Sequence, residues 1–358
     1  MNNNESMVMP TELAEGHEIR TKPEPRCALC GSEGKVMYEQ QRDRLFSAPG
    51  SWTIKRCSNL ECGVIWPDPM PIEADIYKAY TNYYTHASSK QGKRFAWLRA
   101  FYQQMKRGYW SGKYGYCIPS VNSVHVALGK LLYLLPLRRR EVDECVRYLP
   151  ALPQGKLLDV GCGSGEWLLT MRELGWQVDG VDFDDNAVKV ARQKGLNVAC
   201  GDLHQQNYLN DQFDAITLNH VIEHVPDPIR TLVECRRILK PGGKLAIFTP
   251  NGASLSHRLF KQDWRGLETP RHLHVYSNDS LLRLLQQAGF SQVVIHPQIA
   301  FSVIYESTLL QHGWTGQELK RGRRWYASAC ARVFNLWELC RFRFDPSVAD
   351  CVGSIATK

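Results

Sequence analysis

The segment that most constrains the fold is residues 155–168, GKLLDVGCGSGEWL. Its apolar start predicts a short strand, Gly161, Gly163 and Gly165 predict a tight turn, and a helix is expected to open at Glu166. Such a turn lets a ligand approach bare backbone N–H groups. A G-x-G-x-x-G dinucleotide turn would have its third glycine at position 166. The glutamate at this position therefore favours a smaller nucleoside ligand over a nicotinamide dinucleotide.

Two carboxylates are placed to complete such a nucleoside site. Asp159 lies on the strand just before the turn, and Asp182 ends the next apolar strand, 21 positions after Gly161. An acid at the end of the second strand can bind ribose hydroxyls. An ordinary glycine-rich turn without a ligand is the simpler alternative, and these carboxylates argue against it.

Five segments of residues 156–297 together resemble the class I S-adenosylmethionine-dependent methyltransferases. These segments are LLDVGCGSG, GVDFDDNAVKVAR, GDL at 201–203, FDAITLNHVIEHVPDP at 213–228 and ILKPGGKLAIFTPN at 238–251. The resemblance implies S-adenosylmethionine as the cofactor, with Asp182 binding both ribose hydroxyls, Asp202 the adenine amino group and the Leu203 N–H facing the ring. The cofactor-binding residues that it implies are Asp159, Gly161, Gly163, Gly165, Asp182, Asp202, Leu203 and Asn219.

Strands and helices alternate from Gly155 onward, which predicts a parallel sheet with helices on both faces. The resemblance adds an antiparallel pair of strands at the C-terminal end, so the expected class is an α/β, Rossmann-like fold. The strands that we expect are Lys156–Val160, Gln177–Val181, Asn197–Cys200, Phe213–Leu218, Lys244–Thr249, Gln292–His296 and Val352–Ala356.

Two pairs of cysteines near the N-terminus match the knuckles of a four-thiolate zinc ribbon. Cys27 and Cys30 lie in C-A-L-C-G, and Cys57 and Cys62 lie in C-S-N-L-E-C-G, each pair followed by glycine. The glycine allows the turn in which backbone N–H groups face the sulfurs. A closed four-sulfur site is structural and not catalytic. The second pair is spaced more widely than usual, and four unrelated cysteines are the alternative.

The fourth expected strand is followed by Asn219-His220-Val221-Ile222-Glu223-His224, a position that faces the transferable methyl group. His220 and His224 are four residues apart and would share a face if this segment were helical. A histidine suits proton removal from an acceptor, so His224 is a candidate base. Two alternatives stay open: Glu223 and His224 bind a divalent metal, as in catechol-type O-methyltransferases, or His224 only packs against its helix.

A loop after the fifth strand carries more chemistry than a linker needs. Residues 264–274 read WRGLETPRHLH and resemble a loop of methyltransferases from sugar and secondary-metabolite pathways. The resemblance implies that the loop closes over the acceptor. His272 is the first candidate for the proton acceptor, and Arg271 for holding an anionic group of the substrate. The alternative is that Arg271 and Glu268 pair to hold the loop closed.

The rest of the chain consists of smaller units around this core. A helix is expected over Glu141–Leu149, and a second over Asp279–Gly289. The expected divisions are a disordered tail at 1–26, a zinc-ribbon-like module at 27–66, a helical linker or substrate cap at 67–150, the core at 151–298, and a helical insertion with the final strand at 299–358.

Two basic aromatic stretches stand out in a chain of net charge +8. Lys93–Lys113 holds six Lys/Arg and no acid, and Glu318–Arg343 holds seven Lys/Arg and two Glu, both with interleaved aromatic residues. Such faces can pack on the main domain, lie on an anionic membrane surface or bind nucleic acid. No export signal and no long apolar run is visible, so a cytoplasmic protein is expected, with contact at the inner membrane surface left open.

The resemblance implies methyl transfer to a small molecule, a sugar or a lipid-linked glycan intermediate, mainly by alignment of donor and acceptor with a histidine base. An RNA or DNA methyltransferase that grips nucleic acid with its zinc ribbon and basic helices is the alternative. Against it, N-H-V-I-E-H stands where an N-P-P-Y-like amino-base pocket would be. A binding module without turnover is a third interpretation, which the histidine-rich loop disfavours.

Overall fold

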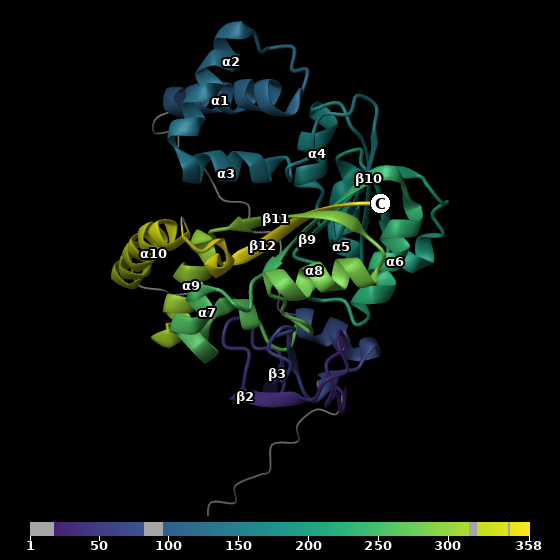
Figure 1. The fold of residues 1–358 in the computed structure, drawn as a ribbon, viewed down its shortest axis with the longest axis vertical. Helices are drawn as coiled ribbons and strands as arrows, with labels where there is room; N and C mark the ends of the chain where they lie inside the picture. Colours follow the sequence, from purple (N-terminus) through teal and green to yellow (C-terminus); the bar gives the residue numbers. More distant parts are fainter. Residues whose placement is uncertain (1–17, 82–95, 315–320, 343) are drawn as a thin grey trace, which may run out of the picture.

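The computed structural model describes residues 18–81, 96–314, 321–342 and 344–358. A seven-stranded sheet with the order β11-β12-β10-β9-β6-β7-β8 forms its centre (Figure 1). Strands β6 to β10 are parallel, and β12 pairs antiparallel with both β10 and β11. The strands are β6 (Lys156–Val160), β7 (Gln177–Asp182), β8 (Asn197–Cys200), β9 (Phe213–Asn219), β10 (Leu239–Pro250), β11 (Ser291–Gln298) and β12 (Cys351–Thr357). The Rossmann-like expectation is confirmed.

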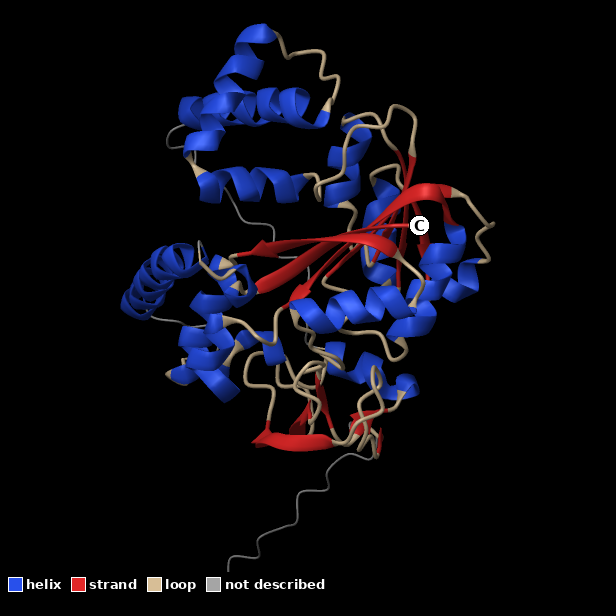
Figure 2. Ribbon diagram, in the orientation of Figure 1, coloured by secondary structure: helices blue, strands red, loops and turns tan. Residues whose placement is uncertain are grey.

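Helices cover both faces of this sheet, as Figure 2 shows. On one face lie α4 (Glu166–Glu173) and α5 (Asp185–Gln193), which bury Leu168 and Val188 against the strands. On the other lie α6 (Pro228–Ile238) and α8 (Asn278–Gln287), which bury Leu232 and Leu284. Because both faces are covered, four of the five residues of β6 are buried, including the polar Asp159. The carboxyl ends of these strands are therefore the open edge of the sheet.

An N-terminal module packs below the sheet in Figure 1. Its three-stranded antiparallel sheet comprises β2 (Gly34–Gln41), β3 (Trp52–Cys57) and β4 (Ile65–Pro67). Two further short strands, β1 (Thr21–Lys22) and β5 (Met70–Pro71), pair antiparallel, and the 3-10 helix η1 (Glu73–Tyr80) follows. The Ile65 backbone bridges to Val275 of the core, so the module is joined to the core by backbone hydrogen bonds as well as by packing.

The disordered tail expected at 1–26 is wrong for its last nine residues. Residues 1–17 lie outside the described residues, whereas 18–26 are ordered. The Arg20 guanidinium lies 3.0 Å from the Asp75 carboxylate, and the Trp66 indole N–H donates to the Glu24 carbonyl at 2.8 Å. These long-range contacts were invisible in a segment without hydrophobic periodicity.

A helical unit precedes the core and contains α1 (Ala96–Tyr114), α2 (Ser123–Gly129), η2 (Lys130–Leu134) and α3 (Pro136–Cys145). A Cβ at Gly108 would lie 1.8 Å from the His125 carbonyl oxygen, so glycine allows α1 and α2 to cross closely. The helix expected over Glu141–Leu149 is misplaced. The backbone leaves helical geometry at Arg147 and Tyr148, where φ is +48° and +56°. Helix α3 also begins earlier than expected, at Pro136, and proline is well suited to the first turn of a helix.

The remaining elements surround the carboxyl edge of the sheet. Between β11 and β12 stand α9 (Phe301–Gln311) and α10 (Arg321–Phe342), and α10 packs Ala331 and Phe334 into a third apolar cluster. Over the described residues, no helix has the length and apolar character needed to cross a bilayer. The short elements are η3 (Leu203–Gln206), α7 (Leu255–Phe260), η4 (Lys261–Asp263), η5 (Arg265–Leu267) and η6 (Pro346–Val348).

Candidate active site

The glycine turn between β6 and α4 leaves open space where side chains would otherwise stand. Gly161, Gly163 and Gly165 all have positive φ, at +73°, +53° and +76°. A Cβ at Gly161 would lie 2.4 Å from a methyl carbon of Val221, whereas a Cβ at Gly163 would meet nothing within 4 Å. The turn is therefore tightly packed at its start and open at its middle, where a ligand can approach the backbone.

The carboxylate of Asp182 lies at the end of β7 beside this turn. One of its oxygens accepts the Gly163 N–H at 2.7 Å, and the other accepts the Asp184 N–H at 2.9 Å. The residue is only 8% exposed, and burial raises the pKa of its carboxyl group. Each carboxylate oxygen retains a further lone pair. Asp182 can thus fix the turn and still accept hydroxyl hydrogen bonds.

The other expected cofactor residues follow the neighbouring strands. Asp202 comes after β8, where its carboxylate accepts the His204 N–H at 2.8 Å and caps η3, and Leu203 is buried behind it. Asn219 is the last residue of β9 and is partly exposed. Asp159 is different, because its carboxylate is buried and already binds Arg147 and the Thr217 hydroxyl. The structure brings these residues to one edge of the sheet.

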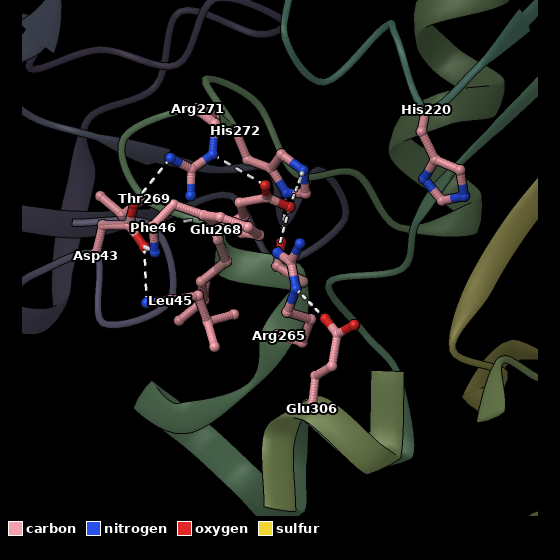
Figure 3. A network of polar contacts seen from close by, with 12 residues as sticks. Asp43, Leu45, Phe46, His220, Arg265, Glu268, Thr269, Arg271, His272 and Glu306 are labelled. Carbon is pink, nitrogen blue, oxygen red and sulfur yellow. Dashed lines mark hydrogen bonds and ion pairs between the residues drawn. The ribbon is translucent and has the colours of Figure 1, made fainter. Parts of the chain in front are cut away.

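Arg271 belongs to a buried ion-pair network in the loop over this edge (Figure 3). Its Nε donates to Glu268 at 2.9 Å, and its Nη1 donates to Asp43 of the N-terminal module at 2.8 Å. Arg265 contacts the other oxygen of Glu268 and also pairs with Glu306 of α9. Burial opposes ionisation of Glu268, but the charges of Arg265 and Arg271 and the hydrogen bond from Arg265 act together against it and hold the pKa well below its usual range. The pairing of Arg271 with Glu268, one of the two alternatives, is present.

His224 and His272 lie side by side, with ring centroids 4.7 Å apart. The His272 Nδ1 is 2.7 Å from the Gly266 carbonyl oxygen, and the His224 Nδ1 is 3.0 Å from the Arg271 carbonyl oxygen. A carbonyl can only accept, so both contacts favour the Nδ1–H tautomer and leave a lone pair on Nε2. The Tyr80 hydroxyl also contacts the His224 Nδ1, at 2.8 Å.

Glu223 lies next to these two rings and is fully buried. One of its oxygens is 3.2 Å from the His220 Nδ1, and within the described part of the chain its Oε2 has no hydrogen-bond partner. Burial alone would raise its pKa, but the hydrogen bond with His220 and the neighbouring histidines together bring the pKa down to about 2. Burial lowers the pKa of His272 to about 4, against the charge of Glu268. At neutral pH the site therefore combines a carboxylate with a neutral imidazole.

The segment that carries His220 and His224 is a turn and not a helix, so the shared helical face is wrong. His220 has φ +54° and is exposed, and α6 begins only at Pro228. His224 instead faces His272 from the other loop. One ligand atom each from Glu223, His224 and His272 lies within 4.8 Å of the others, an arrangement that keeps the divalent-metal alternative open.

The four N-terminal cysteines converge as expected. The Cys27 and Cys62 sulfurs are 3.6 Å apart, the Cys30 and Cys57 sulfurs are 3.3 Å apart, and all four lie within 4.8 Å of one another. Tetrahedral zinc with bonds of about 2.3 Å separates its sulfurs by about 3.8 Å. Gly31 and Gly63, which follow the two pairs, have φ +73° and +64°. The donor set and its spacing fit zinc.

Comparisons with known proteins agree with this geometry. Residues 135–295 match the model of a family described as a methyltransferase domain. A ubiquinone biosynthesis O-methyltransferase of Thiobacillus denitrificans is 33% identical over 167 residues, which cover 43% of this chain and 70% of that protein. The chain belongs to the class I S-adenosylmethionine-dependent methyltransferases.

A further relative and a solved structure also match this methyltransferase. A ubiquinone biosynthesis O-methyltransferase of Xanthomonas oryzae is 35% identical over 136 residues, 36% of this chain and 57% of the relative. The match thus spans a little more than half the length of that relative. A solved S-adenosylmethionine-dependent methyltransferase from Archaeoglobus fulgidus covers 64% of this chain and 99% of its own, at 21% identity and a TM-score of 0.42.

Sequence reasoning missed two residues of the methyltransferase site. Tyr80 closes η1 and reaches His224 with its hydroxyl, and its ring meets the exposed ring of Phe183 at 5.3 Å. Asp43 lies on the loop between β2 and β3 and reaches Arg271. Asp43 comes from the zinc-ribbon-like module, for which only a structural role was expected, and Tyr80 from the segment expected to be a helical linker or substrate cap.

Proposed function

We propose that this methyltransferase methylates a small-molecule acceptor, a class that includes a sugar or lipid-linked glycan intermediate. Two relatives named as O-methyltransferases support an oxygen as the accepting atom. The observation that carries the proposal is the pair formed by His224 and His272, held beside the end of β9 with both Nδ1 atoms directed at backbone carbonyls.

S-adenosylmethionine would lie along the open edge formed by the glycine turn, Asp182, Asp202 and Asn219. The open space at Gly163 and the free lone pairs of Asp182 fit such a ligand. When bound, the sulfonium supplies an electrophilic methyl group. The protein's part is alignment: its backbone turn and carboxylates fix the donor, which favours in-line displacement by an acceptor held on the opposite side.

The two histidines would receive the acceptor's proton. His224 is the more accessible ring, and the Nδ1–H tautomer leaves its Nε2 free to accept a proton. His272 is nearly buried and, with a pKa of about 4, stays neutral, so it can serve as base or orient His224. Arg271 is only 1% exposed and donates to Glu268, Asp43 and the Ala79 carbonyl. We therefore assign it to holding the loop and not to an anionic substrate group.

The four cysteines would hold one structural zinc ion. A Cys₄ site has no open coordination position, so the ion adds folding energy and no chemistry. Through Asp43 and Tyr80, a correctly folded module would contribute to the wall of the active site.

The test is methyl transfer from labelled S-adenosylmethionine to panels of hydroxylated aromatics, nucleotide sugars and short RNAs. We expect transfer to a small-molecule class, lost in His224→Ala or His272→Ala, with cofactor affinity by calorimetry unchanged. His312→Ala, at the end of α9, is the matched control and should stay active. Transfer to RNA alone would overturn the small-molecule proposal, and full activity in both histidine variants would overturn the base.

A further inference from the structure

Helix α10 has two apolar faces, one buried against the protein and one exposed on the outer side of the helix. Ala327, Ala331 and Phe334 point into the protein and are at most 8% exposed. Trp325, Val333 and Leu336 are 73%, 68% and 61% exposed. At about 100° per residue, these three lie opposite the buried set. A surface helix normally presents polar residues on its outer side, so this second apolar stripe is unusual.

The exposed charged side chains described for α10 are all positive. Arg323, Arg324, Arg332 and Arg341 are exposed, while the one acid of the helix, Glu338, is fully buried. Of these arginines, Arg332 lies beside the outer apolar stripe. An apolar stripe on a basic helix can insert its side chains at a bilayer boundary while the cations meet lipid phosphates.

The helical unit presents a second surface of the same kind. Trp97 and Phe101 near the start of α1 are 69% and 47% exposed, and Leu134 and Leu135 around the end of η2 are 76% and 49% exposed. Residues 96–140 contain eight Lys/Arg and no Asp or Glu. This segment therefore repeats the combination found on α10, with large apolar side chains in an acid-free basic setting.

Both surfaces stand on the side of the molecule that holds the active site. In Figure 1 the helical unit and α10 lie on either side of the end of β11. Strand β11 runs in the same direction as β10, since both are antiparallel to β12. Its end thus marks the carboxyl edge of the sheet, where the glycine turn and the histidines are placed. A flat partner that touched both surfaces would lie across the entrance to that edge.

We propose that these two surfaces dock the enzyme on an anionic lipid bilayer. Tryptophan is enriched at the boundary between lipid tails and head groups, and basic residues there are attracted to anionic lipids. Aliphatic residues such as Leu134, Val333 and Leu336 offer nothing to stacked bases or phosphates, which disfavours a nucleic acid. The proposal goes beyond methyl transfer and does not depend on which acceptor is methylated.

Vesicle sedimentation tests this with the full-length protein. Binding to vesicles of phosphatidylcholine with about one third phosphatidylglycerol should exceed binding to phosphatidylcholine alone by at least tenfold, and should weaken with salt. Trp325→Ser/Leu336→Ser and Leu134→Ser/Leu135→Ser should each reduce binding several-fold. Leu209→Ser is the matched control: this leucine is 74% exposed but precedes β9, at the opposite edge of the sheet. Unchanged cofactor affinity would show that each variant is folded.

Three results would overturn the proposal. The first is no preference for anionic vesicles in the wild-type protein. The second is salt-sensitive binding to RNA without vesicle binding, which would identify these surfaces as a nucleic-acid-binding site. The third is a dimer, seen by sedimentation velocity and abolished in the double variants, again without vesicle binding.

Discussion

Asp43 and Arg271 are 228 residues apart in the chain, and their side chains meet at 2.8 Å in the interior of the protein. Both side chains are almost completely buried, at 4% and 1% exposure. The N-terminal module is therefore part of the loop's support and not an appended unit. A buried pair of this kind holds its geometry firmly, because separating the two charges leaves the buried Asp43 carboxylate without its cation.

We expect Asp43→Asn to destabilise the protein and to lower turnover. Removing one partner of a buried ion pair costs about 3–5 kcal/mol, and the remaining Glu268 cannot alone fix the Arg271 side chain. Urea unfolding measures the stability. Asp263→Asn is the control, since its pairing with Arg44 is nearer the surface, with the two side chains 18% and 41% exposed, and is worth about 1 kcal/mol. Equal losses in the two variants would contradict a special role for Asp43.

Asp182→Ala should weaken cofactor binding at least tenfold in calorimetry. The variant loses both the acceptor for ribose hydroxyls and the carboxylate that fixes the Gly163 N–H. Asp185→Ala, three residues along at the exposed start of α5, should bind the cofactor normally. If both variants bind equally well, Asp182 does not contact the ribose.

Tyr80→Phe should lower kcat about tenfold and leave cofactor affinity unchanged. The substitution keeps the ring against Phe183 and removes only the hydroxyl that contacts the His224 Nδ1, and such supporting contacts are worth about ten- to a hundredfold where they orient a functional histidine. Tyr77→Phe, at a 65% exposed tyrosine of the same 3-10 helix, is the control. An unchanged kcat would remove Tyr80 from the site.

Purified protein should contain about one zinc ion per chain by elemental analysis. Cys62→Ser should lose it and unfold the N-terminal module, because such a small unit depends on its metal. Cys200→Ser, at an exposed cysteine outside the cluster, should keep it. A second equivalent of divalent cation, lost in His272→Ala, would favour metal binding by Glu223, His224 and His272 over a histidine base.

Stability should fall as the pH drops from about 6.5 to 4. Burial lowers the pKa values of His257, His272 and His274 to about 4, below the ordinary value of about 6.5. In this window the unfolded chain binds protons that the folded protein excludes, so acid favours unfolding. Urea unfolding at pH 7 and pH 5 measures the loss, which should be smaller for His257→Gln. Parallel losses in the two proteins would contradict this origin.

The sequence predicted the sheet well, because each strand of the core is a short apolar run bounded by turn residues. Strands β6 and β8 have the predicted bounds, and the other strands of the core sheet differ by one or more residues at their ends. Strand β10 is the largest departure, since it begins at Leu239 and continues through Gly242, where φ is +77° and the register shifts. Periodicity does not report such an irregularity.

The candidate site was predicted less completely, because several of its contacts join distant segments. His224 and His272 were both candidates, but their contact depends on two turns whose conformations leave no local pattern. Asp43 reaches the site from a module for which only a structural role was expected, and the contact of Tyr80 with His224 joins segments more than 140 residues apart. The pairing of Arg271 with Asp43 joins the loop to another module, so it could not be predicted from the loop alone.

The position of β12 inside the sheet affects how the chain can fold during synthesis. Strand β11 forms its hydrogen bonds with β12 and has no other neighbour in the sheet, yet β12 follows it by more than fifty residues. Until those last residues leave the ribosome, β10 and β11 both present unpaired edges. A stalled or truncated chain would therefore expose two strand edges with unpaired backbone N–H and C=O groups. These edges can pair with other chains, so we expect such a chain to aggregate.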